Sequence, residues 1–206
     1  MEQLSQEQLK EFDEKGFLFF PSLFETAEMD SLTSQLDDLF ALDIVCNLRE
    51  KGKKAVRTNW AAHNYNSAFA RLSRHPRMIK PVEQLFDEGV YMHQFKVNAK
   101  AAFDGDVWQW HQDFGTWHAD DLMPEPRAMN IAIFLDDVNE HNGPLMFIPG
   151  SHKQGVLEAG HDTETTSYPL WTLDPKTISS LVREGGIVSP KGRAGSMILF
   201  HSCLVH

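Results

Sequence analysis

The chain has 206 residues, 42% of them hydrophobic, and a formal net charge of -10 at pH 7. This length allows one sizeable core and no linker, repeat or biased tail interrupts it, so we expect a single domain over residues 1–206. Nucleic-acid binding needs a basic face that displaces counterions from phosphates, and such an acidic chain therefore argues against a nucleic-acid partner.

The start of the chain and the number of cysteines indicate the cell compartment in which the protein works. MEQLSQEQLKEF lacks the basic and apolar regions of a secretory signal, and no apolar run reaches the length of a membrane span. Two cysteines, Cys46 and Cys203, are too few for a disulfide framework or a thiolate zinc site. We expect a cytoplasmic protein without a membrane partner, in which histidine and carboxylate would hold any metal.

Helices are predicted in the first part of the chain. Residues 5–15 read as a short helix with Ser5 as N-cap, Gln8 three residues on, and Gly16 at its end. Residues 17–20 read as a strand. Residues 25–42 have apolar side chains at helical spacing, and a further helix is predicted over residues 67–86.

From residue 90 onward the pattern predicts strands. The expected strands are residues 90–99, 107–114, 128–135, 144–148, 186–189 and 196–205, separated by turn signals such as Asp104-Gly105 and Asn142-Gly143-Pro144. One more helix is expected over residues 174–184, with Gly185-Gly186 as its cap. Many short, irregularly spaced strands predict a mainly β fold with flanking helices, a sandwich or a jelly-roll barrel.

The stretch WQWHQDFGTWH, residues 108–118, holds the side chains best suited to chemistry. Side chains alternate between the two faces of an extended strand, so His111 and Asp113 project to one side and Gln112 to the other. An imidazole nitrogen and a carboxylate oxygen could then bind the same ion. A His-x-Asp alone occurs in many unrelated proteins, so this prediction depends on a third ligand.

The stretch MILFHSCLVH, residues 197–206, offers two histidines as the third ligand. Either would complete the two-histidine, one-carboxylate face of non-haem iron(II) oxygenases, which leaves coordination positions open. In a strand, His206 shares a face with Ile198 and Phe200, whereas His201 lies on the other face. Both faces are mostly apolar, so alternation does not choose between the two histidines.

Several longer motifs together resemble one family. They are YMHQFKVNAK, GDVWQWHQDFGTWHADDLMPEPRAMN and NGPLMFIPGSH, with GFLFFPSLFE near the start and GRAGSMILFHSCLVH at the end. This set is similar to the phytanoyl-CoA dioxygenase superfamily and, within it, most similar to the ectoine hydroxylases. The resemblance covers nearly the whole chain. It implies a double-stranded β-helix, a cupin-like jelly-roll barrel that holds the metal near one mouth.

The resemblance also implies a role for individual residues. In this family the second ligand histidine closes the terminal strand, which selects His206, with His111 and Asp113, as the catalytic iron ligands and leaves His201 as a structural neighbour. The positions expected beside the 2-oxoglutarate co-substrate are Gln94, Asn98 and Asn130. Those expected beside the substrate are Gln94 and Trp117.

The activity implied is that of an Fe(II)- and 2-oxoglutarate-dependent dioxygenase that consumes O2, with ascorbate helpful in vitro. Retention of Asp113 favours hydroxylation, because halogenating members of the superfamily lack this carboxylate. A CoA thioester would need basic groups for its phosphates, and no basic cluster lies near the motifs. We expect a small zwitterionic, amino-acid-like or ectoine-like substrate, and both a monomer and a homodimer are compatible with the sequence.

This chain also departs from the ectoine hydroxylases. They carry Ser, Glu and Gly where it has Gln112, Gly115 and Leu122, and we expect these changes to shift selectivity away from ectoine. The family holds the distal carboxylate of 2-oxoglutarate with an arginine on the strand after the second histidine, through a bidentate contact. We therefore expect Gly-Ser and further strands that carry this arginine beyond His206.

Three other classes fit part of the pattern. A jelly-roll zinc or manganese hydrolase or isomerase could use the same ligands, and dependence of turnover on ferrous iron and 2-oxoglutarate would separate it. A non-catalytic binding module could keep the barrel, and the absence of the co-substrate arginine would favour it. An interaction or structural protein with core histidines would bind no metal.

Overall fold

The computed structural model describes residues 3–206, and these residues form two compact units. The unit that we call the terminal unit combines Ser5–Leu23 with Val107–His206. The other, the middle unit, consists of Phe24–Asp106 and the described residues up to Leu4. Within residues 3–206, no helix has both the length and the apolar character that crossing a membrane requires.

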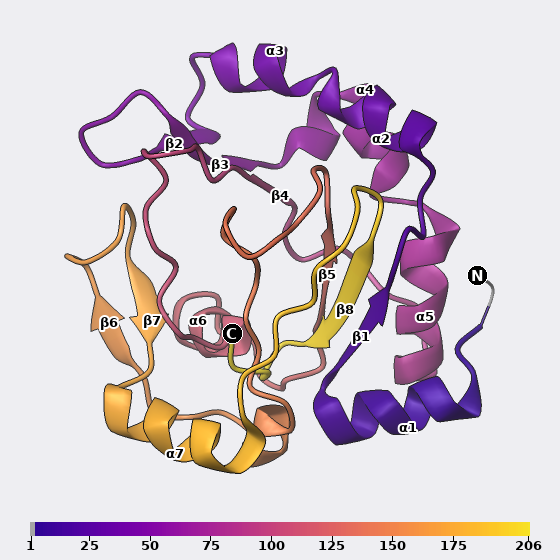
Figure 1. The fold of residues 1–206 in the computed structure, drawn as a ribbon, viewed down its shortest axis with the longest axis vertical. Coiled ribbons are helices and arrows are strands. Elements are labelled where there is room, and N and C mark those ends of the chain that lie inside the picture. The colour runs from indigo at the N-terminus through magenta and orange to yellow at the C-terminus, as the bar shows by residue number, and fades with distance from the viewer. Residues whose placement is uncertain (1–2) are drawn as a thin grey trace. The chain divides into compact units, whose positions relative to one another are not determined.

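The terminal unit is built around a three-stranded antiparallel sheet. Its helices are α1 (Gln6–Lys15), α6 (Asp113–Asp120) and α7 (Pro175–Gly185), with the 3-10 turn η2 (Ser151–Gln154). Its strands are β1 (Phe17–Phe20), β5 (Met129–Ile133), β6 (Gly160–Asp162), β7 (Leu170–Thr172) and β8 (Met197–His201). Strand β8 lies between β1 and β5 (Figure 1), and β6 pairs with β7.

The core of the terminal unit explains why β8 forms its central strand. The first four residues of β8, MILF, are almost fully buried, as expected for a strand covered on both faces, which appears in sequence as a continuous apolar run. Phe200 lies opposite Phe17 in β1 and Asn130 in β5. The ring of Phe147 stacks on Phe17 at 5.2 Å between centroids and meets Phe200 edge-on at 5.1 Å. These aromatic contacts join β1 to β8 through Phe147.

Helix α1 confirms the predicted start and stop. The Ser5 hydroxyl accepts a hydrogen bond from the Gln8 backbone N–H, and the Gln8 side chain accepts one from the Ser5 N–H, which makes a capping box. Gly16 ends the helix with φ +83°. A Cβ at Gly16 would lie 2.4 Å from Nδ1 of His152, so glycine is required there both for backbone conformation and for space.

The middle unit carries a second antiparallel sheet, in the order β2-β3-β4. Its strands are β2 (Asn47–Arg49), β3 (Val56–Trp60) and β4 (Lys96–Asn98). Its helices are α2 (Thr26–Thr33), α3 (Leu36–Ala41), α4 (Ser67–Leu72) and α5 (Pro76–Phe86), with the 3-10 turn η1 (Ala62–Asn64). The guanidinium of Arg57 lies 3.3 Å from the carboxylate of Glu50, and both side chains are almost completely buried.

Two predicted long helices are wrong in extent, because each is broken in the structure. The helix expected over residues 25–42 is divided into α2 and α3. The Ser31 and Thr33 hydroxyls donate to helical carbonyls near the break, and side chains that bond in this way favour a bend. The helix expected over residues 67–86 is divided into α4 and α5 at Pro76. Proline fits the first turn of α5 and holds His75 in an extended conformation that α4 cannot continue through.

The predicted strands are also shorter than expected. Only Lys96–Asn98 is a strand within residues 90–99, and β8 ends at His201 rather than continuing to residue 205. The expected strands 144–148 and 186–189 are reduced to a single bridge between Phe147 and Val188. Pairs β2–β3 and β6–β7 were not predicted, because their members are only three to five residues long and lack a clear alternating pattern.

Two histidines lie side by side where η2 packs on the end of α1. His152 Nε2 lies 3.1 Å from the carbonyl oxygen of Asp13 and donates to it, since a carbonyl can only accept. His201 Nδ1 accepts a hydrogen bond from the Cys203 N–H, and the two imidazole rings are 5.4 Å apart. Burial lowers the pKa of His201 to about 4 and also lowers the pKa of His152. Both rings are therefore neutral in the folded protein at pH 7.

We predict that this histidine pair makes stability fall on mild acidification. The unfolded chain takes up protons below the ordinary histidine pKa of about 6.5, whereas folded His201 does so only near pH 4, so stability is lost as pH falls through that interval. Urea unfolding with a chelator present, at pH 7.5 and pH 5.0, measures the loss. His201→Gln should reduce this pH dependence, and an unchanged pH dependence in that variant would contradict the assignment.

Leu122 generates a second stability prediction. It follows α6 with φ +58°, in the left-handed region, and its side chain is 82% exposed. Replacing Leu122 by Gly, the residue of the ectoine hydroxylases, relieves strain of about 1–2 kcal/mol and adds unfolded-chain entropy, so we expect a net gain of about 0.5–1 kcal/mol in unfolding free energy. Leu122→Ala, which keeps the Cβ, is the control and should show no such gain. Equal stability of the two variants in urea unfolding would refute the prediction.

Candidate metal centre

Within residues 3–206, one group of three side chains could hold a metal ion: His111, Asp113 and His206. Nε2 of His111 lies 3.4 Å from Oδ1 of Asp113, and Nε2 of His206 lies 3.7 Å from Oδ2 of the same carboxylate. The ligand atoms all lie within 4.8 Å of one another. The three residues that the sequence singled out as iron ligands are therefore close together in the terminal unit.

Backbone pairing brings the two histidines together. The His111 N–H donates to the His206 carbonyl at 2.9 Å, and the His206 N–H donates back to the His111 carbonyl at 3.1 Å. Residues that pair in this reciprocal way send their side chains to the same side. The two rings are accordingly 4.2 Å apart between centroids.

Asp113 reaches the same place from a helix. We predicted a strand over residues 107–114, and this prediction is wrong, because Asp113 is the first residue of α6. Gln112 before it is still extended, with φ -118° and ψ 128°, so the expected alternation holds between residues 111 and 113. The N–H of Phe114 donates to the carbonyl of Ser202 at 3.0 Å, which joins the start of α6 to residues 202–206, called the terminal segment below.

The hydrogen bonds of both imidazoles fix the tautomer that a metal needs. Nδ1 of His111 lies 2.7 Å from the carbonyl oxygen of Gln109, and Nδ1 of His206 lies 3.0 Å from that of Leu204. A carbonyl oxygen accepts only, so each Nδ1 carries a hydrogen, and in the neutral ring Nε2 is the nitrogen that offers a lone pair beside Asp113. Backbone carbonyls orient metal-binding histidines in this way.

The burial of the three side chains also favours metal binding. The side chains of His111 and His206 are 6% and 7% exposed, and that of Asp113 is 17% exposed. A largely buried carboxylate is expensive to desolvate unless a cation neutralises it. The donor set of two nitrogens and one carboxylate oxygen fits a divalent transition metal, in the facial arrangement that leaves positions open for other ligands.

His201 lies outside this cluster. Strand β8 ends at His201 and a turn follows, so strand alternation does not extend to residue 206. The Nδ1 of His201 is occupied by the Cys203 N–H, and its ring lies against that of His152. The structure thus places His206, and not His201, beside His111 and Asp113, and the role of His206 as a ligand stays a prediction.

Two of the other predicted site residues lie in the terminal unit. Trp117 is 5% exposed and lies four residues after Asp113 in α6, a spacing that puts both on one face of the helix. Asn130 lies opposite Phe200 in the β5–β8 pair, and the Phe200 ring is 5.0 Å from that of His206. The amide Nδ2 of Asn130 is buried with no hydrogen-bond partner among the described residues.

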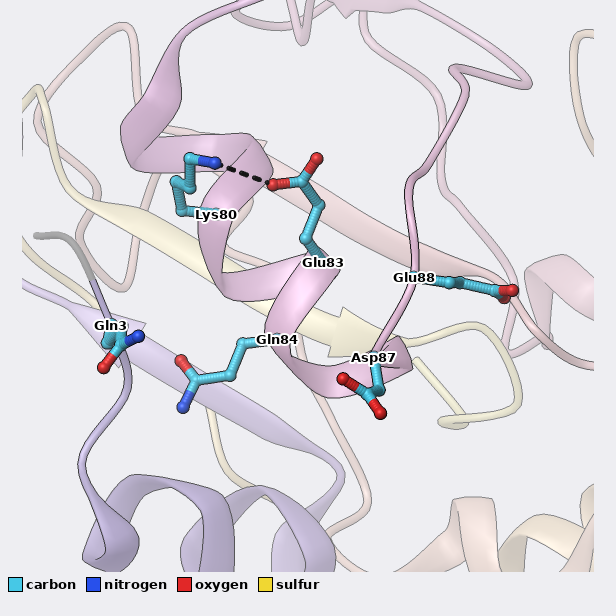
Figure 2. Close-up of a pocket in the computed structure, with 6 residues that line it drawn as sticks. All are labelled: Gln3, Lys80, Glu83, Gln84, Asp87 and Glu88. Carbon is cyan, nitrogen blue, oxygen red and sulfur yellow. Dashed lines mark hydrogen bonds and ion pairs between the residues drawn. The ribbon is translucent and has the colours of Figure 1, made fainter.

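The remaining two predicted residues, Gln94 and Asn98, lie in the middle unit. Oε1 of Gln94 is buried without a hydrogen-bond partner among the described residues, and the Asn98 side chain accepts a hydrogen bond from the Thr58 hydroxyl. A hollow elsewhere in the middle unit is lined by polar side chains of the α5 region and by one residue near the start, Gln3, Lys80, Glu83, Gln84, Asp87 and Glu88 (Figure 2). None of these six was predicted as a site residue.

Two aromatic residues that the sequence did not single out hold the ring of His206. Phe147 is fully buried with its ring 6.0 Å from that of His206, and Phe200 meets the same ring edge-on at 5.0 Å. Their apolar runs indicated core positions, but the contact with His206 arises from long-range packing. These rings limit the orientations that the histidine can adopt.

Gln112 and Leu122 make no contact with the cluster that the structure shows through their side chains. The Gln112 side chain is bonded to backbone groups on the side opposite to His111 and Asp113, and Leu122 is largely exposed. Neither therefore supports the expectation that it changes substrate selectivity. Gly115 lies in α6, and a Cβ there would meet only the Cβ of Gln112, at 3.9 Å.

Known proteins resemble this chain over most of its length. The ectoine dioxygenase of Bordetella bronchiseptica is 33% identical, with 98% of this chain and 69% of the relative covered. The L-proline trans-4-hydroxylase of Streptomyces griseoviridis is 36% identical, with coverages of 93% and 75%.

Solved structures are also similar to this chain. EctD from S. alaskensis with 2-oxoglutarate and 5-hydroxyectoine matches with a TM-score of 0.86 and 32% identity, over 98% of this chain and 69% of that chain. EctD from the same source with bound Fe matches with a TM-score of 0.84 and 32% identity, over 98% and 70%. The likeness confirms the predicted fold class, a jelly roll with flanking helices. Residues 12–206 match the model of the phytanoyl-CoA dioxygenase (PhyH) family, and the chain belongs to this family.

Proposed function

We propose that this protein is a non-haem iron(II)- and 2-oxoglutarate-dependent dioxygenase that hydroxylates a small zwitterionic molecule, with His111, Asp113 and His206 as the iron ligands. The observation that carries the proposal is the facial cluster of two Nε2 atoms and one carboxylate within 4.8 Å. Relatives named ectoine dioxygenase and L-proline trans-4-hydroxylase, and EctD structures with Fe and with 2-oxoglutarate, support the same chemistry.

The protein's part in this chemistry is to bind and orient. When bound, the iron and 2-oxoglutarate supply the redox chemistry, in which O2 is consumed, the keto acid becomes succinate and carbon dioxide, and one oxygen atom enters a C–H bond of the substrate. His111, Asp113 and His206 would hold the iron, and three protein ligands would leave coordination positions for these reactants. The backbone carbonyls behind both histidines keep the nitrogen lone pairs directed toward Asp113.

Asn130 supports a co-substrate contact in the terminal unit. Its buried Nδ2 is an amide donor without a protein partner among the described residues, and its β8 neighbour, Phe200, packs on the ring of His206. A buried donor of this kind is stabilised by an oxygen acceptor, and a keto acid supplies one. The roles of Gln94 and Asn98 beside the co-substrate and substrate stay predictions from the family resemblance.

Trp117 supports the substrate class. Its indole is on the face of α6 that begins with Asp113, and an indole can cover an apolar ring or attract a cationic group. Ectoine and proline both combine a ring with opposite charges, which such a surface suits. We further propose that the protein acts in the cytoplasm on this small molecule, with neither nucleic acid nor membrane as a partner. The two cysteines, Cys46 and Cys203, are both free, which fits a reducing compartment.

We predict that replacing any one ligand by Ala abolishes metal binding and turnover. Loss of an outer partner of a metal ligand typically costs about 10–100-fold in affinity, so loss of His111, Asp113 or His206 itself should cost at least about 100-fold. Titration with Co(II), followed by its visible absorption, measures the affinity. His201→Ala is the matched control and should retain metal affinity. Loss of binding in His201→Ala, with His206→Ala unaffected, would show that the wrong histidine was chosen.

The substrate prediction is tested by succinate release. We expect turnover with ectoine or with proline-like amino acids, dependent on ferrous iron and 2-oxoglutarate, and a product that mass spectrometry shows to have gained one oxygen atom. The Gln112 side chain bonds to backbone groups and Leu122 is largely exposed, so ectoine itself belongs in the panel. Other free amino acids and acyl-CoA esters complete the panel. Turnover of acyl-CoA esters with none of the zwitterionic compounds would contradict the proposed substrate class.

A further inference from the structure

Gln112 stands between two proposed ligands, His111 and Asp113, and its side chain points the other way. Its backbone is extended, so its side chain alternates with theirs. It is the N-cap residue of α6, yet it makes no side-chain hydrogen bond to the helix. Only 3% of Gln112 is exposed. A buried amide at this position needs hydrogen-bond partners elsewhere.

Those partners are backbone groups of two other segments. The Nε2 of Gln112 donates to the carbonyl of Cys203 at 2.6 Å and to the carbonyl of Gly155 at 2.9 Å. Its Oε1 accepts from the N–H of Leu157 at 2.9 Å. One side chain thus joins the segment before α6, the terminal segment and the loop after η2 by three hydrogen bonds.

The bond to Cys203 lies on the stretch that leads to His206. Main-chain bonds already join this stretch to α6, from the Phe114 N–H to the carbonyl of Ser202, and to the residue before Gln112, through His206 itself. The amide of Gln112 adds a bond between these two points. It holds the two ligand-bearing segments together on the face opposite to the cluster.

We propose that Gln112 is a positioning residue that sets the separation between the carboxylate of Asp113 and the imidazole of His206. The proposal rests on the proposed function, because it assumes that these two side chains bind the metal. The two segments meet side by side, and a hydrogen bond on one face limits how far they twist or part on the other. Loss of the amide therefore widens or tilts the ligand set without removing a ligand.

The alternative is that Gln112 only fills space in the core. Met matches its length and volume but cannot bond to Cys203, Gly155 or Leu157, so Gln112→Met separates filling from bonding. Gln112→Glu keeps the acceptor for the Leu157 N–H and loses both donors. Gln84→Met is the matched control, because the Gln84 amide makes a comparable pair of bonds with the Leu4 backbone, at 2.6 and 3.1 Å, within the middle unit.

The test is titration of the whole protein with Co(II), monitored by its visible spectrum, with thermal unfolding measured on the same samples. We expect Gln112→Met and Gln112→Glu to weaken Co(II) binding about 10–100-fold, the range for partners that orient metal ligands, and to alter the Co(II) absorption bands. Gln84→Met should bind Co(II) with the affinity and spectrum of the unaltered protein, even where its thermal stability falls by a similar amount.

The outcomes separate this inference from the proposed function. If the unaltered protein fails to bind Co(II), or if His111→Ala binds it equally well, the proposed metal site is wrong. If the unaltered protein binds Co(II) and a folded Gln112 variant has the same affinity and spectrum, only the positioning role is overturned. Failure of both Gln112 variants to fold, while Gln84→Met folds, would assign Gln112 to stability alone and would also overturn the inference.

Discussion

The reciprocal backbone hydrogen bonds between His111 and His206 are the constraint on which the candidate centre depends. They join residues 95 positions apart in the chain and send both imidazoles to the same side. A shift of one residue in this pairing would turn one ring to the opposite face, because side chains alternate. The carbonyls of Gln109 and Leu204 then accept from the Nδ1 atom of each ring, so backbone groups contribute both to the position and to the orientation of the two imidazoles.

The pairing is itself held by the core of the terminal unit. Leu204 and Val205, just before the last ligand, are fully buried in two neighbouring apolar clusters. Phe147 and Phe200 pack on the ring of His206 and on each other. A cavity in this core would displace a ligand as well as lower stability, since close-packed interiors transmit strain. His111 and His206 lie outside the helices and strands, and the buried clusters around Leu204 and Val205 therefore support the proposed centre.

Features that depend on neighbouring residues, such as helix caps, could be predicted from the sequence. The capping box at Ser5 and the stop at Gly16 were predicted because they involve neighbouring residues, whereas the break before α5 was missed although Pro76 lies at it. The start of α6 at Asp113 was not readable. Its first turn contains Gly115, a poor helix former, and its support comes from Ser202, which is remote in sequence. The choice of His206 over His201 likewise depends on long-range pairing that periodicity does not record.

Two departures from the ectoine hydroxylases lie at the start of α6, which is held by hydrogen bonds to residues remote in the sequence. Their Ser and Glu at the positions of Gln112 and Gly115 have the three-residue spacing of a capping box, in which each side chain bonds to the other's backbone N–H. The Gln112 amide bonds to other segments instead, and Gly115 has no side chain that could accept a hydrogen bond from the Gln112 N–H. The N–H of Phe114 is taken by Ser202. In this chain, tertiary hydrogen bonds from Gln112 and Phe114 therefore hold the start of α6, where a Ser and a Glu at these positions could form a local cap.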